Sequence, residues 1–363
     1  MSNSNNTCTG VASARIATLD ALRAFAVIGV FIYHLCELNP ILGVLYPKLK
    51  WIPQLGNFGV ELFYVISGYF IGNAILRPAV WSPGYYVQQR ARRILPAYYV
   101  SLFILGAISL RHAEGVVNFL LHITMLHTFI PWAHGGVNGV YWTLGVEFSF
   151  YILMLALAPF YRQKRHQVTL CLCMVLVANL WRAGVFYSGE NNIWMRFFLA
   201  SQLPGALDAF GWGGLAAVLM RRDWCRSRFE AIYSLLAGVL GVAVIVCCMW
   251  YFGYKDNPWF DLPSAIFWRT CLTGGFFLLL LSLAIGGGRL QLNFFARWSG
   301  LAFIGKISFS IYLWHLPIML LVRKHGGEYG MDSMSSGITV MVLATLLVAG
   351  LSFYFVERRW HRF

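Results

Sequence analysis

Charged residues are scarce in this sequence, and their scarcity excludes most soluble folds. Asp, Glu, Lys and Arg make up 12% of the 363 residues, and hydrophobic residues make up 59%. Soluble domains carry about 25% charged residues, which they need for a hydrated surface. The apolar runs are continuous and lack the alternation of membrane β-strands. We therefore expect an all-α fold, a polytopic helical bundle in a membrane.

Acidic residues are half as numerous as basic residues, 14 against 28, and the formal net charge is +14. In a soluble protein this excess would favour nucleic-acid binding. In a membrane protein, basic residues gather in the cytoplasmic loops and account for such an excess. We therefore expect membrane lipids, and no nucleic acid, as partners.

Motifs that hold metals or nucleotides are also missing. The eight cysteines include no CxxC pair, and the histidines at positions 112, 122, 127 and 134 form no HExxH pattern. No glycine-rich loop of the Walker or Rossmann kind is present. We expect no metal site, and we interpret these histidines as residues of loops or of the outer membrane interface.

Ten apolar segments have the length of a membrane span, or nearly so. They cover residues 18–38, 57–76, 94–110, 138–160, 167–186, 204–220, 229–252, 263–285, 302–322 and 334–356. A further stretch, residues 115–131, is too short and too interrupted for a span. It predicts a re-entrant or interfacial helix.

Basic residues cluster at alternate ends of these segments. Examples are Arg90–Arg93 after the second, Arg221–Arg228 after the sixth and Arg358–Arg362 at the C-terminus. The opposite loops carry fewer, so both termini are predicted to be cytoplasmic, in agreement with about ten transmembrane helices. Residues 1–14 are small and polar and predict a mobile N-terminal tail. Residues 15–363 predict a single membrane domain.

Two polar residues interrupt the first span, LDALRAFAVIGVFIYHL. Arg23 and His34 are eleven positions apart, which is about three helical turns, so they point the same way roughly 16 Å apart. Such residues need a polar cavity or a partner inside a membrane. A neutral imidazole suits proton abstraction from a hydroxyl. The alternative is a local pair of Arg23 with Asp20 and a histidine bonded to a backbone carbonyl.

Three arginines follow the second span in GYYVQQRARRILP. Arg90 and Arg93 share a helical face, and Arg92 lies beside them. Guanidinium groups at a membrane edge suit a polyphosphate ligand. The alternative is the ordinary excess of cytoplasmic charge in contact with anionic lipid.

Three further polar residues lie in other apolar segments. Glu147, in VYWTLGVEFSFY, lies well inside a span and indicates function or a buried arginine partner. Glu61 indicates a carboxylate at the outer water interface of a packing segment. His315 follows Tyr312 by three residues in GKISFSIYLWHLP, which indicates either a site or a polar seam between helices.

These stretches, in this order, resemble the acyltransferase-3 family of integral-membrane acyltransferases over residues 18–357. The most specific is LDALRAFAVIGVFIYH, which matches the family pattern of Arg, ten residues and His at Arg23 and His34. The others are FGVELFYVISGYFIG, YYVQQRARRILPAYY, YWTLGVEFSFY, ISFSIYLWHLPI and YFVERR. Glu61 stands where the family often has Asp.

The resemblance implies a ten-helix enzyme that takes an acyl group, most often acetyl, from cytoplasmic acyl-CoA. The group passes to a hydroxyl of a carbohydrate or lipid-linked sugar, frequently at the outer face of a bacterial inner membrane. It implies functional roles for Arg23, His34, Arg90, Arg93 and Glu147. No metal is needed, because a thioester is already activated.

The mechanism expected from these roles assigns the arginines of residues 90–93 to the phosphates of CoA. Arg23 would bind the pantetheine arm or the thioester carbonyl, and His34 would be the general base. Glu147 would orient His34 or bind the sugar. His34 could instead carry the acyl group itself. The alternative to an enzyme is a proton-coupled transporter or flippase of an anionic or lipid-linked solute.

Overall fold

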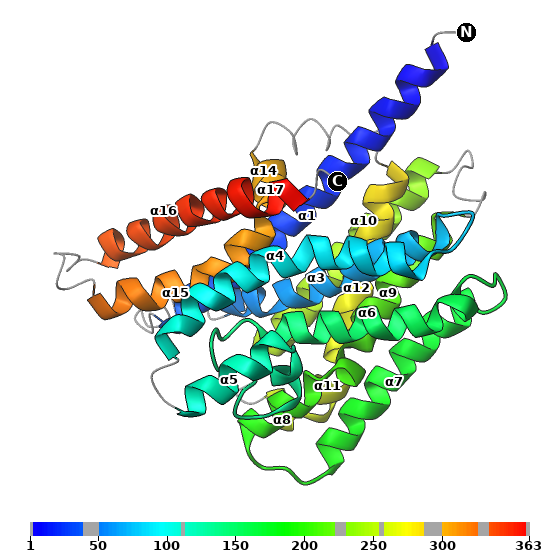
Figure 1. Cartoon of the computed structure of the whole chain (residues 1–363). Helices are drawn as coiled ribbons and strands as arrows, with labels where there is room; N and C mark the ends of the chain where they lie inside the picture. Colours follow the sequence, from blue (N-terminus) through cyan, green and yellow to red (C-terminus); the bar gives the residue numbers. More distant parts are fainter. Residues whose placement is uncertain are drawn as a thin grey trace. The chain divides into compact units, whose positions relative to one another are not determined.

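The computed structural model of the chain describes residues 3–38, 51–109, 113–221, 230–253, 258–286, 300–325 and 334–360. Within these ranges the chain is helical apart from turns and short loops (Figure 1). The all-α class predicted from the composition is therefore confirmed.

The structure describes a series of helices along the chain. In order they are α1 (Asn3–Leu38), α3 (Trp51–Leu76), α4 (Pro83–Ser109), α5 (Ala113–Ile123), η2 (Leu126–Phe129), α6 (Trp142–Tyr161), α7 (Gln167–Tyr187), α8 (Ile193–Ala200), α9 (Leu203–Leu219), α10 (Glu230–Gly253), η4 (Pro258–Phe260), α11 (Leu262–Ile266), α12 (Trp268–Gly286), α14 (Leu301–Lys306), α15 (Ser308–His325), α16 (Met334–Ser352), η6 (Phe353–Glu357) and α17 (Arg358–Trp360).

Six of the described helical segments are long and apolar enough to cross a membrane. They cover Thr18–Leu38, Phe58–Leu76, Trp142–Tyr161, Gln167–Tyr187, Ile232–Phe252 and Ser335–Trp360. Two shorter apolar helices, Leu203–Leu219 and Trp268–Leu283, coincide with two more predicted spans. The chain is therefore an integral, multi-pass membrane protein with a helical bundle.

The two remaining predicted spans, 94–110 and 302–322, are helical where the structure describes them but are bounded differently. Helix α4 starts at Pro83, before the predicted span at 94–110, so it carries the arginines of residues 90–93. The predicted segments 263–285 and 302–322 are each divided, between α11 and α12 and between α14 and α15. The short helix expected in 115–131 is present as α5. Helix α1 begins at Asn3; the mobility expected of residues 1–14 stays a prediction.

The chain divides into two compact units. The first unit contains Met1–Ile28, Asn57–Ala79 and Ala156–Lys306, and the second contains Gly29–Gly56, Val80–Leu155 and Ile307–Phe363. Each unit therefore collects segments that are distant in sequence. Several basic residues used to predict the orientation, such as Arg222, Arg226 and Arg228, lie outside the described residues.

In the first unit, helices approach closely where both carry glycine. A Cβ atom on Gly213 of α9 would lie 2.0 Å from the carbonyl oxygen of Val65 on α3. A Cβ atom on Gly68 of α3 would lie 2.2 Å from the carbonyl oxygen of Phe210 on α9. Only glycine permits such a distance, and small residues bring helices together in this way in membranes.

A buried arginine joins four helices of the first unit. Arg182 on α7 is 1% exposed, and its Nη2 lies 2.7 Å from Asp208 Oδ2 on α9. It also donates to Thr270 Oγ1 at 2.7 Å, to the Gly205 carbonyl at 2.8 Å and to the Ile266 carbonyl at 2.9 Å. Each nitrogen of the guanidinium group thus has an acceptor, which makes the group a structural connector rather than a ligand site.

Glu61, another buried carboxylate of the first unit, is also paired. Glu61 is 5% exposed, and its Oε1 lies 3.3 Å from Arg269 Nε. The two groups form an ion pair without hydrogen-bond geometry at Nε. The expectation that Glu61 lies at a water interface was therefore wrong, because an arginine from a later helix supplies the partner that water would have supplied.

The second unit packs α15 along α16 (Figure 1). Ser310 of α15 donates to the Glu357 carboxylate and lies 3.0 Å from the Ser352 hydroxyl, and all three side chains are buried. On the other side of this unit, Tyr98 of α4 donates to the His122 carbonyl at 2.7 Å. These bonds hold the helices that carry the candidate site.

Replacing Arg182 by Met should destabilise the protein strongly. The substitution keeps the volume but leaves the Asp208 carboxylate buried without its cation, which costs about 3–5 kcal/mol. Thermal unfolding in detergent should show a lower midpoint for Arg182→Met than for Arg165→Met, because Arg165 is exposed. Adding Asp208→Asn to Arg182→Met should recover part of the loss. An unchanged midpoint in Arg182→Met would show that the network does not stabilise the bundle.

Candidate active site

Two histidines meet in the second unit. His34 lies on α1 and His315 on α15, and His315 Nε2 is 3.2 Å from His34 Nδ1. Their ring centroids are 5.1 Å apart. His315 is 0% exposed, whereas His34 is half-buried. A fully buried ring therefore supports a more accessible one, an arrangement in which the accessible ring can exchange protons.

Backbone carbonyls supply the other partners of the two rings. His34 Nδ1 lies 3.0 Å from the Val30 carbonyl oxygen. His315 Nδ1 lies 2.8 Å from the Tyr312 carbonyl oxygen and 3.1 Å from that of Ile311. Within the described part of the chain, the hydrogen bonds of the His34 ring involve only Val30 and His315. The sequence left open that His34 is only a structural residue bonded to a backbone carbonyl, and the bond to Val30 agrees with that alternative. The contact with His315 adds a partner from another helix.

Helix α15 is fixed to the chain around the start of α6. The Tyr312 hydroxyl lies 2.7 Å from Thr143 Oγ1 and donates to the Val140 carbonyl at 3.2 Å. Asn138 Nδ2 donates to the Leu313 carbonyl at 2.9 Å. These buried bonds determine where the turn that carries His315 lies.

Glu147 lies one turn further along α6 than Thr143. Its carboxylate accepts a hydrogen bond from the Tyr151 hydroxyl, and it interacts electrostatically with Tyr312 and with Arg90. The structure thus places Glu147 between the helix that carries His315 and the helix that carries the arginines. Among the described residues, the hydrogen bonds and electrostatic interactions of the His34 ring do not include Glu147.

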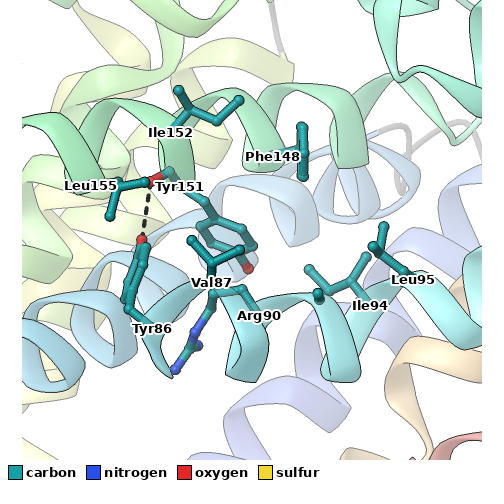
Figure 2. Close-up of a pocket in the computed structure, with 10 residues that line it drawn as sticks. Tyr86, Val87, Arg90, Ile94, Leu95, Phe148, Tyr151, Ile152 and Leu155 are labelled. Atoms are coloured by element: carbon teal, nitrogen blue, oxygen red, sulfur yellow. Dashed lines mark hydrogen bonds between the residues drawn. The ribbon is translucent and has the colours of Figure 1, made fainter. Parts of the chain in front are cut away.

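A cavity of about 190 Å³ lies between α4 and α6. Its walls are almost entirely apolar. Of the two tyrosines that line it, Tyr86 donates from its hydroxyl to the Tyr151 carbonyl at 3.1 Å (Figure 2). The residues that line it are Tyr86, Val87, Arg90, Ala91, Ile94, Leu95, Phe148, Tyr151, Ile152 and Leu155. The cavity therefore suits the aliphatic part of an amphiphilic ligand.

Arg90 is the charged residue that lines this cavity. In Figure 2 its side chain extends from α4 beside the ring of Tyr151, which reaches down from α6. Arg90 Nε is buried and has no hydrogen-bond acceptor among the residues that the structure describes. Arg92 and Arg93 are half-buried on the same helix. A guanidinium group with an unused donor beside an apolar cavity can bind an anion.

Arg23, the sixth predicted site residue, belongs to the first unit. Its Nη1 lies 3.4 Å from Asp20 Oδ1, and its guanidinium carbon lies 4.7 Å from the centre of the Phe70 ring. The contact with Asp20 is the local pair that the sequence offered as the alternative to a functional role, and the contact with Phe70 is also a packing contact. A role of Arg23 in the reaction stays a prediction.

Of the four histidines around α5, His112 lies outside the described residues, and His122, His127 and His134 are buried. His134 lies in a loop, as expected, whereas the burial of all three differs from an exposed interface position. His122 stacks on His127 with ring centroids 4.0 Å apart, and His134 Nδ1 lies 3.0 Å from the Thr128 carbonyl. Burial lowers the pKa of His134 to about 4, so this ring is neutral at physiological pH. Among the described residues, no three His, Cys, Asp or Glu side chains are grouped as metal ligands. The histidines serve the packing of this segment.

Five of the predicted site residues lie in the second unit: His34, Glu147, Arg90, Arg92 and Arg93. The sequence left His315 open between a site and a polar seam, and it did not indicate Tyr151 or Thr143. In the sequence, His315, Tyr151 and Thr143 differ from their neighbours only as polar residues within apolar segments. Pairing across helices cannot be read from spacing along one helix.

Comparison with known proteins identifies the family of the chain. A family model described as "Acyltransferase domain" matches residues 16–357. The O-acetyltransferase OatA of Staphylococcus aureus strain NCTC 8325 is 25% identical over 374 residues, which cover 93% of this chain and 56% of OatA. BcsY of Komagataeibacter xylinus, whose name describes a candidate membrane-bound transacylase, is 24% identical over 368 residues, covering 94% of this chain and 81% of BcsY.

The chain spans about half the length of the OatA relatives that it matches. No solved structure matches it. The family match nevertheless extends over most of the sequence, and it includes every candidate site residue described above. The chain therefore belongs to the acyltransferase-3 family.

Proposed function

We propose that this chain transfers an acyl group, acetyl in the first instance, from acyl-CoA to a hydroxyl of a carbohydrate or a lipid-linked sugar. The observation that carries the proposal is the His34–His315 contact in the same unit as Arg90 and its apolar cavity. A family match over residues 16–357 supports the reaction class. The names of OatA, an O-acetyltransferase, and of BcsY, a transacylase, support transfer of acetyl or acyl groups.

In the proposed reaction, His34 removes the proton from the acceptor hydroxyl as the oxygen attacks the thioester carbonyl. The bond from carbonyl carbon to oxygen forms, and the bond to sulfur breaks. CoA leaves as a thiolate, which takes up a proton. The thioester is activated, so the chain's own residues need to supply only orientation, a base and stabilisation of the developing oxyanion.

The donor would be held by α4. Arg90, with Arg92 and Arg93, would bind the phosphates of CoA, and the buried Nε of Arg90 offers an unused donor for this. The apolar cavity beside it would take the aliphatic part of the pantetheine arm. Burial of apolar surface there would add to the affinity that the charges provide.

The remaining predicted residues have auxiliary roles in this proposal. Arg23 would stabilise the thioester carbonyl as it gains negative charge, in competition with its contact to Asp20. Glu147 would hold Tyr151 and, through it, the wall of the donor cavity. A direct role of Glu147 in binding the sugar is an alternative to this positioning role.

The proposed topology has ten transmembrane helices, a re-entrant or interfacial helix around α5, and both termini in the cytoplasm. The chain would lie in a bacterial inner membrane, with residues 15–363 as the acyltransferase domain and residues 1–14 as a mobile tail. The basic residues of 90–93 then face the cytoplasmic supply of CoA. The acceptor hydroxyl would reach His34 from the outer side.

Replacing His34 by Ala should abolish most of the transfer activity. Loss of a general base lowers turnover by about 10²- to 10⁴-fold, and Arg23→Lys should lower it less, because the charge remains. Turnover is measured with radiolabelled acetyl-CoA in membranes that contain equal amounts of protein. His166→Ala is the matched control, since this half-buried histidine lies at the start of α7 in the other unit. Wild-type turnover in His34→Ala would refute the mechanism.

Replacing Arg90 and Arg93 by Ala should weaken binding of acetyl-CoA. A ligand at 100 times its Kd stabilises the folded state by about 2.7 kcal/mol, so acetyl-CoA should raise the unfolding temperature of the wild type. The rise should be much smaller in the double variant and in Ala91→Phe, which fills the cavity. The pair Arg358→Ala with Arg359→Ala removes the same charge elsewhere and should keep the full rise.

The same measurement separates the enzyme from a carrier. An acyltransferase is stabilised by acetyl-CoA and not by acetate. A carrier of an anionic solute has no reason to prefer the CoA ester. Stabilisation by acetate alone, or an equal response of the double variant and the wild type to acetyl-CoA, would contradict the donor site.

A further inference from the structure

The hydrogen positions on His315 follow from its neighbours. His315 Nδ1 lies 2.8 Å from the Tyr312 carbonyl oxygen and 3.1 Å from the Ile311 carbonyl oxygen. Carbonyl oxygens only accept hydrogen bonds, so Nδ1 must carry a hydrogen and donate it. A neutral imidazole has one N–H group. His315 Nε2 is therefore an acceptor.

The hydrogen position on His34 follows in turn. His34 Nδ1 lies 3.2 Å from His315 Nε2 and 3.0 Å from the Val30 carbonyl oxygen. Both neighbours are acceptors, so His34 Nδ1 carries the hydrogen and shares it between them. The lone pair of the His34 ring is then on Nε2, the nitrogen that these contacts leave unused.

We propose that His315 is a positioning residue that, together with the Val30 carbonyl, holds His34 in the tautomer with hydrogen on Nδ1, so that Nε2 serves as the base. The proposal rests on the proposed role of His34. It also specifies how the acceptor approaches: the acceptor hydroxyl comes to Nε2 of His34, while the opposite side of the His34 ring is hydrogen-bonded to α15.

The contact acquires more strength during the reaction. When His34 Nε2 takes a proton from the acceptor hydroxyl, the ring becomes a cation with hydrogen on both nitrogens. The bond from Nδ1–H to His315 Nε2 is then charge-assisted, and such bonds are roughly twice as strong as neutral ones. A base whose other nitrogen donates to a third group is the arrangement that activates nucleophiles in hydrolases. Here the third group is an imidazole.

His315 is rigid enough for this role. It is 0% exposed, and the turn before it is fixed by the Tyr312–Thr143 contact and by the bond from Asn138 to the Leu313 carbonyl. Its own Nδ1 is held by two carbonyls of its helix. Ring rotation would break these bonds, so Nε2 stays directed at His34.

The test compares two substitutions of His315 in the full-length protein. His315→Leu removes the acceptor, whereas His315→Gln places a side-chain carbonyl near the position of Nε2. Removing the group that orients a metal-binding histidine by a hydrogen bond lowers metal affinity or activity about 10- to 100-fold. We expect a fall of similar size in kcat for His315→Leu. The KM for acetyl-CoA should be unchanged, and His315→Gln should recover most of kcat. His325→Leu, at the end of the same helix, should keep wild-type kcat.

A second readout does not depend on activity. The ¹³Cδ2 resonance of His34, labelled and detected in lipid, distinguishes the two neutral tautomers. It should report hydrogen on Nδ1 in the wild type and in His315→Gln, and a larger share of the other tautomer in His315→Leu, where the Val30 carbonyl remains as an acceptor for Nδ1–H. Wild-type kcat together with an unchanged resonance in His315→Leu would overturn the proposal. If His34→Ala were fully active, the proposed function would fail, while the resonance would still test the tautomer.

Discussion

Every polar group inside this bundle must find its partner within the protein, because lipid offers none. With 12% charged residues in the sequence, the few buried charges and rings stand out by their pairing. Arg182 is bonded to a carboxylate, a hydroxyl and two carbonyls. Glu61 lies against Arg269. The His34–His315 contact follows the same rule and differs in one respect: it leaves one ring nitrogen unused.

That difference separates structural polar groups from candidate functional ones. The network of Arg182 is complete, so it can stabilise the fold but cannot bind a ligand. Arg90 Nε lacks an acceptor among the described residues, and it borders an apolar cavity. His34 is half-buried, whereas its partner is fully buried. A site for an acyl donor and its acceptor requires polar groups that still have hydrogen bonds to offer and room for the ligand beside them.

Much of this arrangement could be predicted from the sequence. The scarcity of charge predicted an all-helical membrane protein, and the apolar segments located its helices, because length and hydropathy are local properties. The spacing of Arg23 and His34 predicted a polar stripe on one helix. The breaks at Phe267 and Ile307, the burial of Glu61 and the partner of His34 could not be predicted, since each depends on a residue far away in the sequence. Only the packing of α15 brings His315 to α1.

The most direct test of the account is a comparison of cell-envelope glycans from cells that contain the wild-type protein, the His34→Ala variant or neither. Mass spectrometry should find an acyl group on a sugar hydroxyl in the wild-type cells alone, and the mass of that group identifies the donor. Identical glycan profiles in all three, with the wild-type protein present in the membrane at a normal level, would contradict the proposal that this chain acylates a carbohydrate through His34.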